Sequence, residues 1–376
     1  MIPVAYDSEI FLLQEYGGVS RYFSSLIEEF LVNPIHGIQP VLSFAKSNNL
    51  YLQELKKKSL IDVDSLKFPY MPPTSPWKTL LTWGPIHHGW LALSANAKVK
   101  SADAKTLHCT YYRPSYIEQA RSEQKVVTVH DFIPERLDWK GVKNPHIGKR
   151  RLCRSASLIF CVSQTTAQDL QEFFGISDSR VKVIGHGVSH FGEVHKRSVR
   201  SGRAKVLYVG HRGGYKNFKV LSQAAEILDD EGVEIEICTV GPVWTEEESR
   251  YFVSRFRNIT WKQESNVSDQ RLTELYSEND LLCFTSKMEG FGLPILEALA
   301  MGTRVLASDI PVFHEVGGEM INYFNPDSRE SLSEKIRELL VREPTENEIK
   351  LRIEYAREYS WHNVAKKVAN AYEEIQ

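Results

Sequence analysis

Cysteines are few in this chain, and none of them is paired at short spacing. The five cysteines are scattered over 376 residues without a CxxC pair, and several, such as Cys161 and Cys283, lie in apolar runs. Disulfide scaffolds and cysteine-ligated zinc modules both need closely spaced cysteines, so the sequence disfavours them. We therefore expect reduced core cysteines in a cytosolic protein.

Long apolar runs and an excess of charge are also missing. No apolar run approaches the roughly 20 residues of a membrane-spanning helix, and residues 1–7 lack the basic start and apolar region of a signal peptide. The 46 basic and 48 acidic side chains give a net charge of −2, which offers no overall attraction to nucleic acid. We expect a soluble or peripheral protein of two domains that binds no nucleic acid.

Several catalytic signatures are absent. There is neither a GxxxxGK[ST] loop nor a GxSxG turn, and the histidines, His87 and His88 included, lack zinc-ligand spacing. These absences disfavour nucleotide hydrolysis, covalent hydrolase chemistry and a zinc site. The triplet 62–64 matches the DxD motif that many sugar transferases use for a divalent cation. Because it follows three lysines in a charged stretch, we interpret the match as accidental and predict no metal site.

Alternating strands and helices run through the sequence in two series. Strand-like apolar runs alternate with amphipathic helical segments up to residue 184 and again from 205 to 324, and three helices end the chain. The polar, basic segment 195–203 has little to bury and is our candidate linker. Two such series predict an α/β protein of two doubly wound, Rossmann-like domains that face an interdomain cleft.

The most informative stretch, 286–297, lies where a strand turns into a helix. The apolar run 280–284 precedes it, and Pro294 suits the first position of a helix. Gly290 and Gly292 allow the backbone of this turn to approach a ligand without interference from side chains. The pattern is typical of a binding turn, and a capped surface helix is the alternative.

Backbone and carboxylate groups of the same stretch point to a polar ligand. The amides of Phe291, Gly292 and Leu293 are expected to be free donors at the helix start, which favours phosphate or dense hydroxyl groups. Glu289 and Glu297 flank the turn. Two carboxylates in these places are suited to hold two different polyhydroxyl groups.

A second glycine-rich turn carries two cations. The strand predicted at 205–210 ends in Gly210, and Arg212 and Lys216 follow just before a helix. Arginine offers a fork of donors that matches phosphate oxygens, and lysine supplies a point charge. We interpret the pair as a diphosphate clamp rather than a solvated basic turn.

The N-terminal series begins with a similar strand, glycine loop and helix. Gly17 and Gly18 follow the predicted strand 2–6 and precede an amphipathic helix, which is the layout of a phosphate-binding corner. The loop is not GxGxxG, so dinucleotide binding finds little support. A tight turn without a ligand remains the alternative.

Two further strands of this series end in polar residues. His108 and Tyr111 end one of them, and His130 and Asp131 end the other. Ligands of an open parallel sheet lie beyond the carboxyl ends of its strands, so these four residues are candidates for one cleft. The alternative for each histidine is a packed, hydrogen-bonded core residue.

Two other segments are unusual in composition. Segment 66–96 mixes aromatic residues and prolines after a lysine cluster. This composition suits contact with a membrane interface or a lipid-linked acceptor. The alternative is a helical hairpin that covers the sheet edge. Segment 144–154 is basic through Lys149, Arg150, Arg151 and Arg154. We interpret it as the solvated face of a helix.

With both halves considered, the chain resembles the retaining glycosyltransferases of family 4, which have the GT-B fold. The resemblance covers nearly the whole chain and is most specific in the E-x7-E element from Glu289 to Glu297. It is carried in order by these segments: 16–22 (YGGVSRY), 128–135 (TVHDFIPE), 208–217 with Arg212 and Lys216, 289–302 and 308–311 (SDIP).

The resemblance implies a role for each matching residue. Arg212 and Lys216 would bind the donor diphosphate and stabilise the leaving nucleoside diphosphate. Glu289 and the amides after Gly290 would hold hydroxyls of the donor sugar, and Glu297 would accept hydrogen bonds from the ribose. Gly17 and Gly18 would approach the diphosphate from the N-terminal domain, and His130 would contact the donor sugar. Similar enzymes need no metal, because the two cations and the helix N-terminus take its part. The nucleotide-sugar is a substrate, so no cofactor is expected.

The same resemblance sets the expected domains. An acceptor-side domain would comprise residues 1–195 and the C-terminal helix at 360–376, which crosses back, and a donor-binding domain would comprise 196–359. One departure from the family is the segment 241–244 (GPVW), where relatives often carry a second glycine. This departure leaves the nucleotide base open.

The function we expect is hexose transfer from a nucleotide-sugar donor to a glycan or lipid-linked acceptor in bacterial surface polysaccharide synthesis. The clamp resembles that of bacterial surface-polysaccharide transferases, many of which use GDP-mannose-type donors, so the resemblance favours such a donor, with UDP-sugars next. The expected place is the cytoplasm, at the inner face of the membrane if 66–96 contacts lipid. The alternatives are a GT-B sugar-nucleotide epimerase or hydrolase, which needs no acceptor, and a non-catalytic nucleotide-sugar-binding protein, which would be expected to lose Arg212, Lys216 or Glu289.

Overall fold

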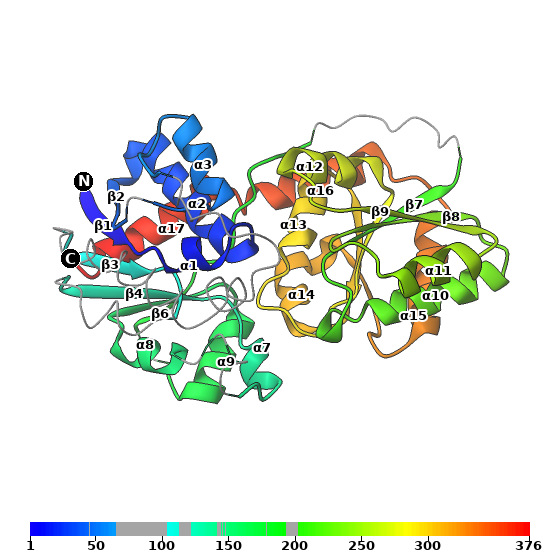
Figure 1. The fold of residues 1–376 in the computed structure, drawn as a ribbon, viewed down its shortest axis with the longest axis horizontal. Coiled ribbons are helices and arrows are strands. Elements are labelled where there is room, and N and C mark those ends of the chain that lie inside the picture. Colours follow the sequence, from blue (N-terminus) through cyan, green and yellow to red (C-terminus); the bar gives the residue numbers. More distant parts are fainter. Residues whose placement is uncertain are drawn as a thin grey trace, which may run out of the picture. The chain divides into compact units, whose positions relative to one another are not determined.

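The computed structural model describes two compact units of the chain (Figure 1). Residues 1–44, 46–64, 104–112, 122–140, 144, 146, 148–177, 179–192 and 202–376 are described. Unit 1 comprises Met1–Gly187 and Trp361–Gln376, and unit 2 comprises Val188–Ser360. The segment 66–96 and most of the expected linker at 195–203 lie outside the described residues.

Unit 1 is built on a six-stranded parallel sheet. Its strand order is β2-β1-β3-β4-β5-β6, and every pairing is parallel. The strands are β1 (Ile2–Tyr6), β2 (Ile38–Leu42), β3 (Thr106–Cys109), β4 (Gln124–Val129), β5 (Leu158–Cys161) and β6 (Val181–Val183). Strands β3 and β5 are buried along their whole length, as expected for a parallel sheet covered on both faces.

Helices cover this sheet, and the last helix of the chain is one of them. Helix α17 lies along α2 (Figure 1), and the hydroxyls of Tyr6 in β1 and Tyr372 in α17 are 3.1 Å apart. The chain therefore returns to its N-terminal unit, as expected. The described helices of unit 1 are α1 (Glu9–Leu13), α2 (Gly18–Val32), η1 (Pro34–His36), α3 (Leu50–Lys57), α7 (Ile133–Arg136), α8 (Lys149–Ser155), α9 (Gln164–Phe174) and α17 (Trp361–Glu373).

Unit 2 has a second six-stranded parallel sheet, in the order β12-β11-β10-β7-β8-β9. Strand β10 at its centre is the apolar run that precedes the 286–297 stretch, and all four of its residues are buried. The strands are β7 (Ala204–Val209), β8 (Ile235–Val240), β9 (Ile259–Glu264), β10 (Leu281–Phe284), β11 (Arg304–Ser308) and β12 (Asn322–Phe324).

The helices of unit 2 connect these strands and close the unit. Helix α10 packs against α15, and α13 packs against α16, so each long helix buries its apolar stripe. The described helices are η3 (Gly214–Lys216), α10 (Phe218–Asp230), α11 (Glu246–Ser254), α12 (Asp269–Glu278), α13 (Leu293–Ala300), α14 (Pro311–Gly317), η4 (Gly318–Met320), α15 (Arg329–Leu340) and α16 (Glu346–Arg357). No helix within the described ranges is long and apolar enough to cross a membrane.

Local sequence signals set several helix ends. Ser163 accepts a hydrogen bond from the amide of Thr166 at the start of α9, and Gly175 ends this helix in the left-handed conformation; serine and glycine are the residue types favoured at these positions. Thr245 and Glu248 form a reciprocal capping box at the start of α11. Helix α11 was not expected from the sequence, although this Thr-x-x-Glu spacing was visible.

Three of the buried histidines of unit 1 have a pKa below the ordinary value of a histidine. His108, His130 and His186 expose 0%, 7% and 8% of their surface. Burial lowers the pKa of His108 and that of His186 to about 3, and it holds the pKa of His130 well below its ordinary value. All three rings are therefore neutral at pH 7, whereas each would take up a proton near pH 6.5 in the unfolded chain.

This difference predicts that unit 1 loses stability as the pH falls below about 6.5. The three histidines are then protonated in the unfolded state but not in the folded state. The free energy of unfolding should therefore fall by roughly 1.4 kcal/mol per histidine between pH 7.5 and 5.5, which is about 4 kcal/mol for all three. Urea denaturation across this range measures it. His108→Gln should remove about a third of the loss, and the exposed His190→Ala should leave it unchanged. Equal slopes for both variants would contradict the assignment.

Candidate functional site

The strand order of unit 2 places the expected donor-binding residues together. When β7 to β12 are numbered 1 to 6, the strands stand in the order 3-2-1-4-5-6 across the sheet. From β7 the chain first adds strands on one side and then, from β10 on, adds them on the other side. Strands β7 and β10 are therefore neighbours, and they are paired in parallel. Ligands of open α/β sheets bind beyond the strand ends at such a switch point. The turn with Arg212 and Lys216 follows β7, and the turn with Glu289 and Gly292 follows β10.

Three contacts join these two turns. The Nζ of Lys216 lies 2.6 Å from Oε1 of Glu289, the hydroxyl of Thr285 donates to the carbonyl of Lys216 (2.8 Å), and the amide of Lys287 donates to the carbonyl of Tyr215 (2.8 Å). The Lys216 and Glu289 side chains are only 19% and 13% exposed. The two turns, which are separate in the sequence, thus form one site with a half-buried ion pair.

Arg212 is held by protein groups from the loop after β8 and from α11. Its Nε and Nη2 donate to the two carboxylate oxygens of Glu248 at 2.7 and 2.9 Å. Its Nη1 and Nη2 donate to the carbonyls of Pro242 (2.6 Å) and Val243 (3.1 Å). The hydrogen bonds from Arg212 hold the pKa of Glu248 below its ordinary value. The departure at 241–244 therefore lies in the loop that positions this guanidinium.

Glycines make the turn after β7 compact. Gly210 has φ 135°, and its amide donates to the carbonyl of Val240 at the end of β8 (2.9 Å). A Cβ on Gly241 would lie 2.4 Å from the carbonyl oxygen of Gly210, so the backbone of this turn packs directly on the loop that holds Arg212.

The start of α13 is shaped by Gly292. This residue has φ 105°, and a Cβ there would lie 3.0 Å from the ring of Phe313, so only glycine suits the position. Leu293 and Pro294 begin the helix, and the amide of Ile295 already donates to the carbonyl of Gly292 (2.9 Å). Gly292 is the N-cap of α13 and Leu293 is its first residue, as expected. The amides of Phe291, Gly292 and Leu293 as ligand donors stay a prediction.

Glu297 lies one turn further along α13 and is oriented by α12. The hydroxyl of Tyr276 donates to Oε2 of Glu297 at 2.7 Å. Glu297 is half-buried, and this bond fixes one carboxylate oxygen. Its expected bond to a ribose stays a prediction, as do the expected roles of the other site residues.

The glycine loop of unit 1 is partly satisfied by its own neighbours. The side chain of Gln14 accepts a hydrogen bond from the amide of Ser20 in the first turn of α2 (3.0 Å). A Cβ on Gly17 would lie 2.5 Å from that same side chain, whereas a Cβ on Gly18 would meet nothing within 4 Å. One amide that a phosphate would need is therefore already bonded to Gln14, a partner that the loop sequence does not reveal.

The strand reversal of unit 1 lies between β1 and β3, and it is occupied by a buried carboxylate. Asp7 follows β1 and accepts hydrogen bonds from the hydroxyl of Thr110 (2.5 Å) and from its amide (3.1 Å). Asp7 also accepts from the amide of Glu9 (2.9 Å). Sequence reasoning missed this group, because nothing local marks Asp7 as the partner of a residue so far along the chain.

His130 follows β4 and differs from the other buried histidines. Among the described residues, neither of its ring nitrogens has a hydrogen-bond partner, while its ring lies edge-on to Tyr22 and Phe23. Buried polar atoms are nearly always paired. Two unpaired ring nitrogens in a neutral imidazole make His130 a ready donor and acceptor for a ligand hydroxyl.

His108, in contrast, is a core residue, which corrects its expected place on the acceptor side. It is fully buried, its Nδ1 lies 2.5 Å from the hydroxyl of Tyr372, and its Nε2 lies 2.8 Å from the hydroxyl of Thr128. Both ring nitrogens are used within the fold, so no atom of His108 is left for a substrate.

Tyr111 and Asp131 lie where the sequence places them, and both have structural contacts. The ring of Tyr111 packs on Tyr112 with centroids 4.5 Å apart, and burial raises the pKa of Tyr111. Asp131 accepts a hydrogen bond from the amide of Ile133 at the start of α7 (2.9 Å). Their acceptor-side role stays a prediction.

Lys149 corrects the expectation of a solvated basic face at 144–154. The side chain is completely buried, and its Nζ donates to Glu135 (2.8 Å), to the carbonyl of Asp131 (2.7 Å) and to His146 (2.9 Å). The ammonium also lies 3.9 Å from the centre of the Phe132 ring. Arg150, Arg151 and Arg154 are exposed, as expected. Lys149 instead ties α8 to the segment that carries His130.

Two family models match consecutive parts of the chain. The model described as Glycosyltransferase Family 4 matches residues 16–190, and the model described as Glycosyl transferases group 1 matches residues 192–358. Together they extend over both doubly wound units. The chain is a glycosyltransferase with the GT-B fold.

This GT-B glycosyltransferase has relatives among mannosyltransferases. The O-antigen chain mannosyltransferase RfbU of Salmonella typhimurium is 25% identical over 288 residues, which are 76% of this chain and 77% of RfbU. The serotype-specific mannosyltransferase WbdA of Escherichia coli is 28% identical over 241 residues, 56% of this chain but only 29% of WbdA. The chain thus spans less than a third of this longer relative.

Solved structures share the fold of the GT-B glycosyltransferase over its whole length. The crystal structure of Anabaena HepE in complex with UDP-glucose has a TM-score of 0.69 and covers 100% of both chains at 15% identity. At this identity the likeness extends to the fold alone.

The buried Lys149 predicts a large effect of its partner carboxylate on stability. Burial lowers the pKa of Lys149, so its charge depends on Glu135, whose side chain is 13% exposed. Glu135→Gln leaves a buried cation without its counter-ion and should lower the free energy of unfolding by about 3–5 kcal/mol. Urea denaturation of unit 1 measures the loss.

A second variant separates the ion pair from the loss of packing. The double change Glu135→Gln with Lys149→Met removes both charges and should recover at least half of that loss, because an apolar side chain of similar length is well tolerated here. A single Glu135→Gln variant that loses less than about 1 kcal/mol would contradict the ion-pair account.

Proposed function

We propose that this glycosyltransferase moves a hexose from a nucleotide-sugar to a glycan or lipid-linked acceptor in surface polysaccharide synthesis. The observation that carries the proposal is the Lys216–Glu289 pair at the switch point of unit 2, next to Arg212. The relatives RfbU and WbdA are mannosyltransferases, which favours a GDP-mannose-type donor. The complex of HepE with UDP-glucose keeps UDP-sugars as the second choice.

The ion pair suggests how unit 2 would divide a donor between its groups. Lys216 and Arg212 are the cations for the diphosphate, whose negative charge grows as the glycosidic bond breaks, and stabilising such developing charge contributes more to catalysis than any other effect in many transfer enzymes. Glu289, released from Lys216, accepts hydrogen bonds from sugar hydroxyls, and Glu297 accepts them from the ribose. In this proposal the two cations take the part that a metal ion plays in other transferases.

We propose that Gly17, Gly18 and His130 of unit 1 contact the same donor. His130 contributes hydrogen bonds rather than charge, because burial holds its pKa well below its ordinary value and the ring is neutral at pH 7. A neutral imidazole with both nitrogens unpaired among the described residues suits a sugar hydroxyl. Transfer with retention, by attack on the face that the nucleotide leaves, needs no protein nucleophile. Peripheral membrane contact through 66–96 completes the proposal for a lipid-linked acceptor.

A donor screen tests this function directly. GDP-, UDP- and dTDP-sugars are compared by thermal shift, and the stabilising donor is then incubated with and without acceptor oligosaccharide. We expect GDP-mannose to shift the melting temperature most, transfer to occur only with acceptor, and EDTA to leave turnover intact. Donor conversion without acceptor would replace the proposal by an epimerase or hydrolase.

Lys216→Ala tests the diphosphate assignment in the same assay. Loss of a cation that stabilises the leaving group should lower kcat about 100-fold, or roughly 3 kcal/mol, with the fold unchanged by circular dichroism. Lys219→Ala is the matched control, since Lys219 is an exposed lysine at the start of α10. Near-normal turnover of Lys216→Ala would overturn the assignment.

Glu248 is expected to compete with the diphosphate for Arg212. Glu248→Gln keeps a side-chain oxygen for the capping box but removes the charge that holds the guanidinium. Nucleoside diphosphate should therefore bind about fivefold tighter, equivalent to roughly 1 kcal/mol, measured by isothermal titration. Exposed Glu247→Gln is the control. Weaker binding by Glu248→Gln would instead mean that Glu248 positions Arg212 for the ligand.

A further inference from the structure

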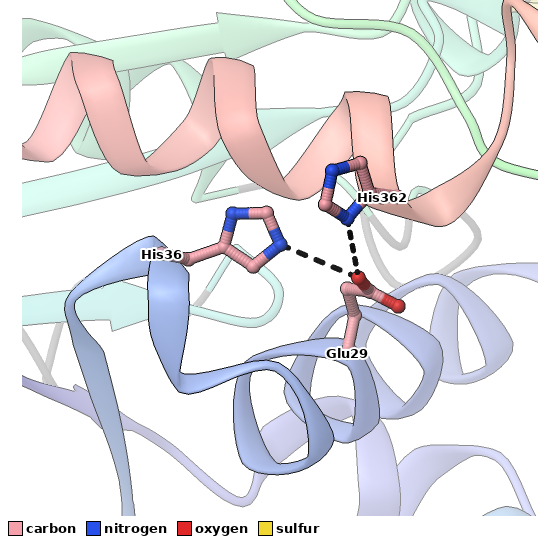
Figure 2. Close-up of side chains that lie close together, drawn as sticks. All are labelled: Glu29, His36 and His362. Atoms are coloured by element: carbon pink, nitrogen blue, oxygen red, sulfur yellow. Dashed lines mark hydrogen bonds and ion pairs between the residues drawn. The ribbon is translucent and has the colours of Figure 1, made fainter.

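Two side chains near the end of α2 and one from the C-terminal helix converge on the surface of unit 1 (Figure 2). Glu29 comes from the last turn of α2, His36 from η1 and His362 from the start of α17. Oε1 of Glu29 lies 3.3 Å from Nε2 of His36 and 3.3 Å from Nδ1 of His362. All three ligand atoms lie within 4.8 Å of one another. None of these residues belongs to the site described above.

Their spacing matches the coordination shell of a tetrahedral metal. Two atoms bound to zinc at about 2.0–2.1 Å in a tetrahedron lie roughly 3.3 Å apart, which is the distance from Glu29 to either histidine. The ligand nitrogens of the two imidazoles lie within 4.8 Å of each other, and binding a metal requires the side chain of His362, which is 55% exposed, to rotate toward His36. Two imidazoles and one carboxylate are a common zinc donor set, with the fourth position left to water.

Packing holds the three elements in place before any ligand binds. Trp361, next to His362, is buried against Tyr22 of α2 with ring centroids 5.6 Å apart. Asn33 at the end of α2 donates its side-chain amide to Oε1 of Glu29 (2.7 Å), which orients the carboxylate as outer-shell partners of metal ligands do. The His36 ring is buried and packs edge-on to Phe30.

We propose that Glu29, His36 and His362 bind one divalent transition-metal ion, with zinc the best fit, in a structural site on unit 1. The ion joins the C-terminal helix to the end of α2, so that residues 333 positions apart in the chain share one ligand shell. Binding to the folded state alone would stabilise the docking of α17. The site takes no part in sugar transfer, so it is compatible with a transfer step that needs no metal.

Zinc titration of the full, tag-free chain tests the site. After treatment with chelator and its removal, isothermal titration with ZnCl2 at pH 7.5 should show one ion per chain, and the melting temperature should rise by about 5 °C at a hundredfold excess of free zinc over Kd. Bound Co²⁺ should give the visible absorption of a tetrahedral complex. His362→Ala should abolish all three signals, because it removes a surface ligand without touching the core.

Two further variants make the result specific. His362→Cys should restore zinc binding, since a thiolate is also a zinc ligand. His314→Ala is the matched control: His314 is a 50% exposed histidine that pairs with Asp309 at 2.6 Å, and its loss should leave the titration unchanged. A flat titration of the unaltered chain would overturn the proposal, and so would undiminished binding by both His362→Ala and Glu29→Gln. The cluster would then be a hydrogen-bonded group only.

Discussion

The parallel pairing of β7 with β10 is the constraint on which the proposed donor site of unit 2 depends. Both strands are buried apolar segments whose register is fixed through Leu281–Val206 and Leu282–Leu207. Their carboxyl ends therefore open on the same edge of the sheet, and every residue that follows either strand is delivered there. A one-residue slip would move every side chain of the strand out of its packing position, so the core that stabilises the sheet also holds Lys216 next to Glu289.

Charge neutralisation explains how such a site persists without its ligand. Lys216 and Arg212 lie close to the same edge, and each has a carboxylate partner, Glu289 and Glu248. A half-buried cation without a partner would carry a desolvation cost. The carboxylates offset this cost in the free protein, and a diphosphate would take over their role. In this proposal, binding the donor exchanges the ion pairs between the cations and the carboxylates for ion pairs between the cations and the diphosphate. Only the difference in free energy between these two sets contributes to the affinity, which is therefore moderate.

Sequence patterns were sufficient for the fold because its signals are local. Apolar runs such as 280–284 indicated the strands, and two strand–helix series indicated the architecture. What the sequence could not supply were partners brought together by the fold. Lys149 was interpreted as solvated because its charge was visible and its burial was not, and the pairing of Arg212 with Glu248 depends on a helix, α11, that was missed.

The contrast between His108 and His130 shows why burial alone does not mark a functional residue. Both are buried, both follow or end strands of one sheet, and burial lowers both pKa values. His108 is fully hydrogen-bonded, so the fold itself accounts for it. His130 has no partner among the described residues, and an unpaired buried polar group costs about 1–3 kcal/mol. In our proposal, a hydroxyl of the donor sugar offsets this cost when it pairs with His130.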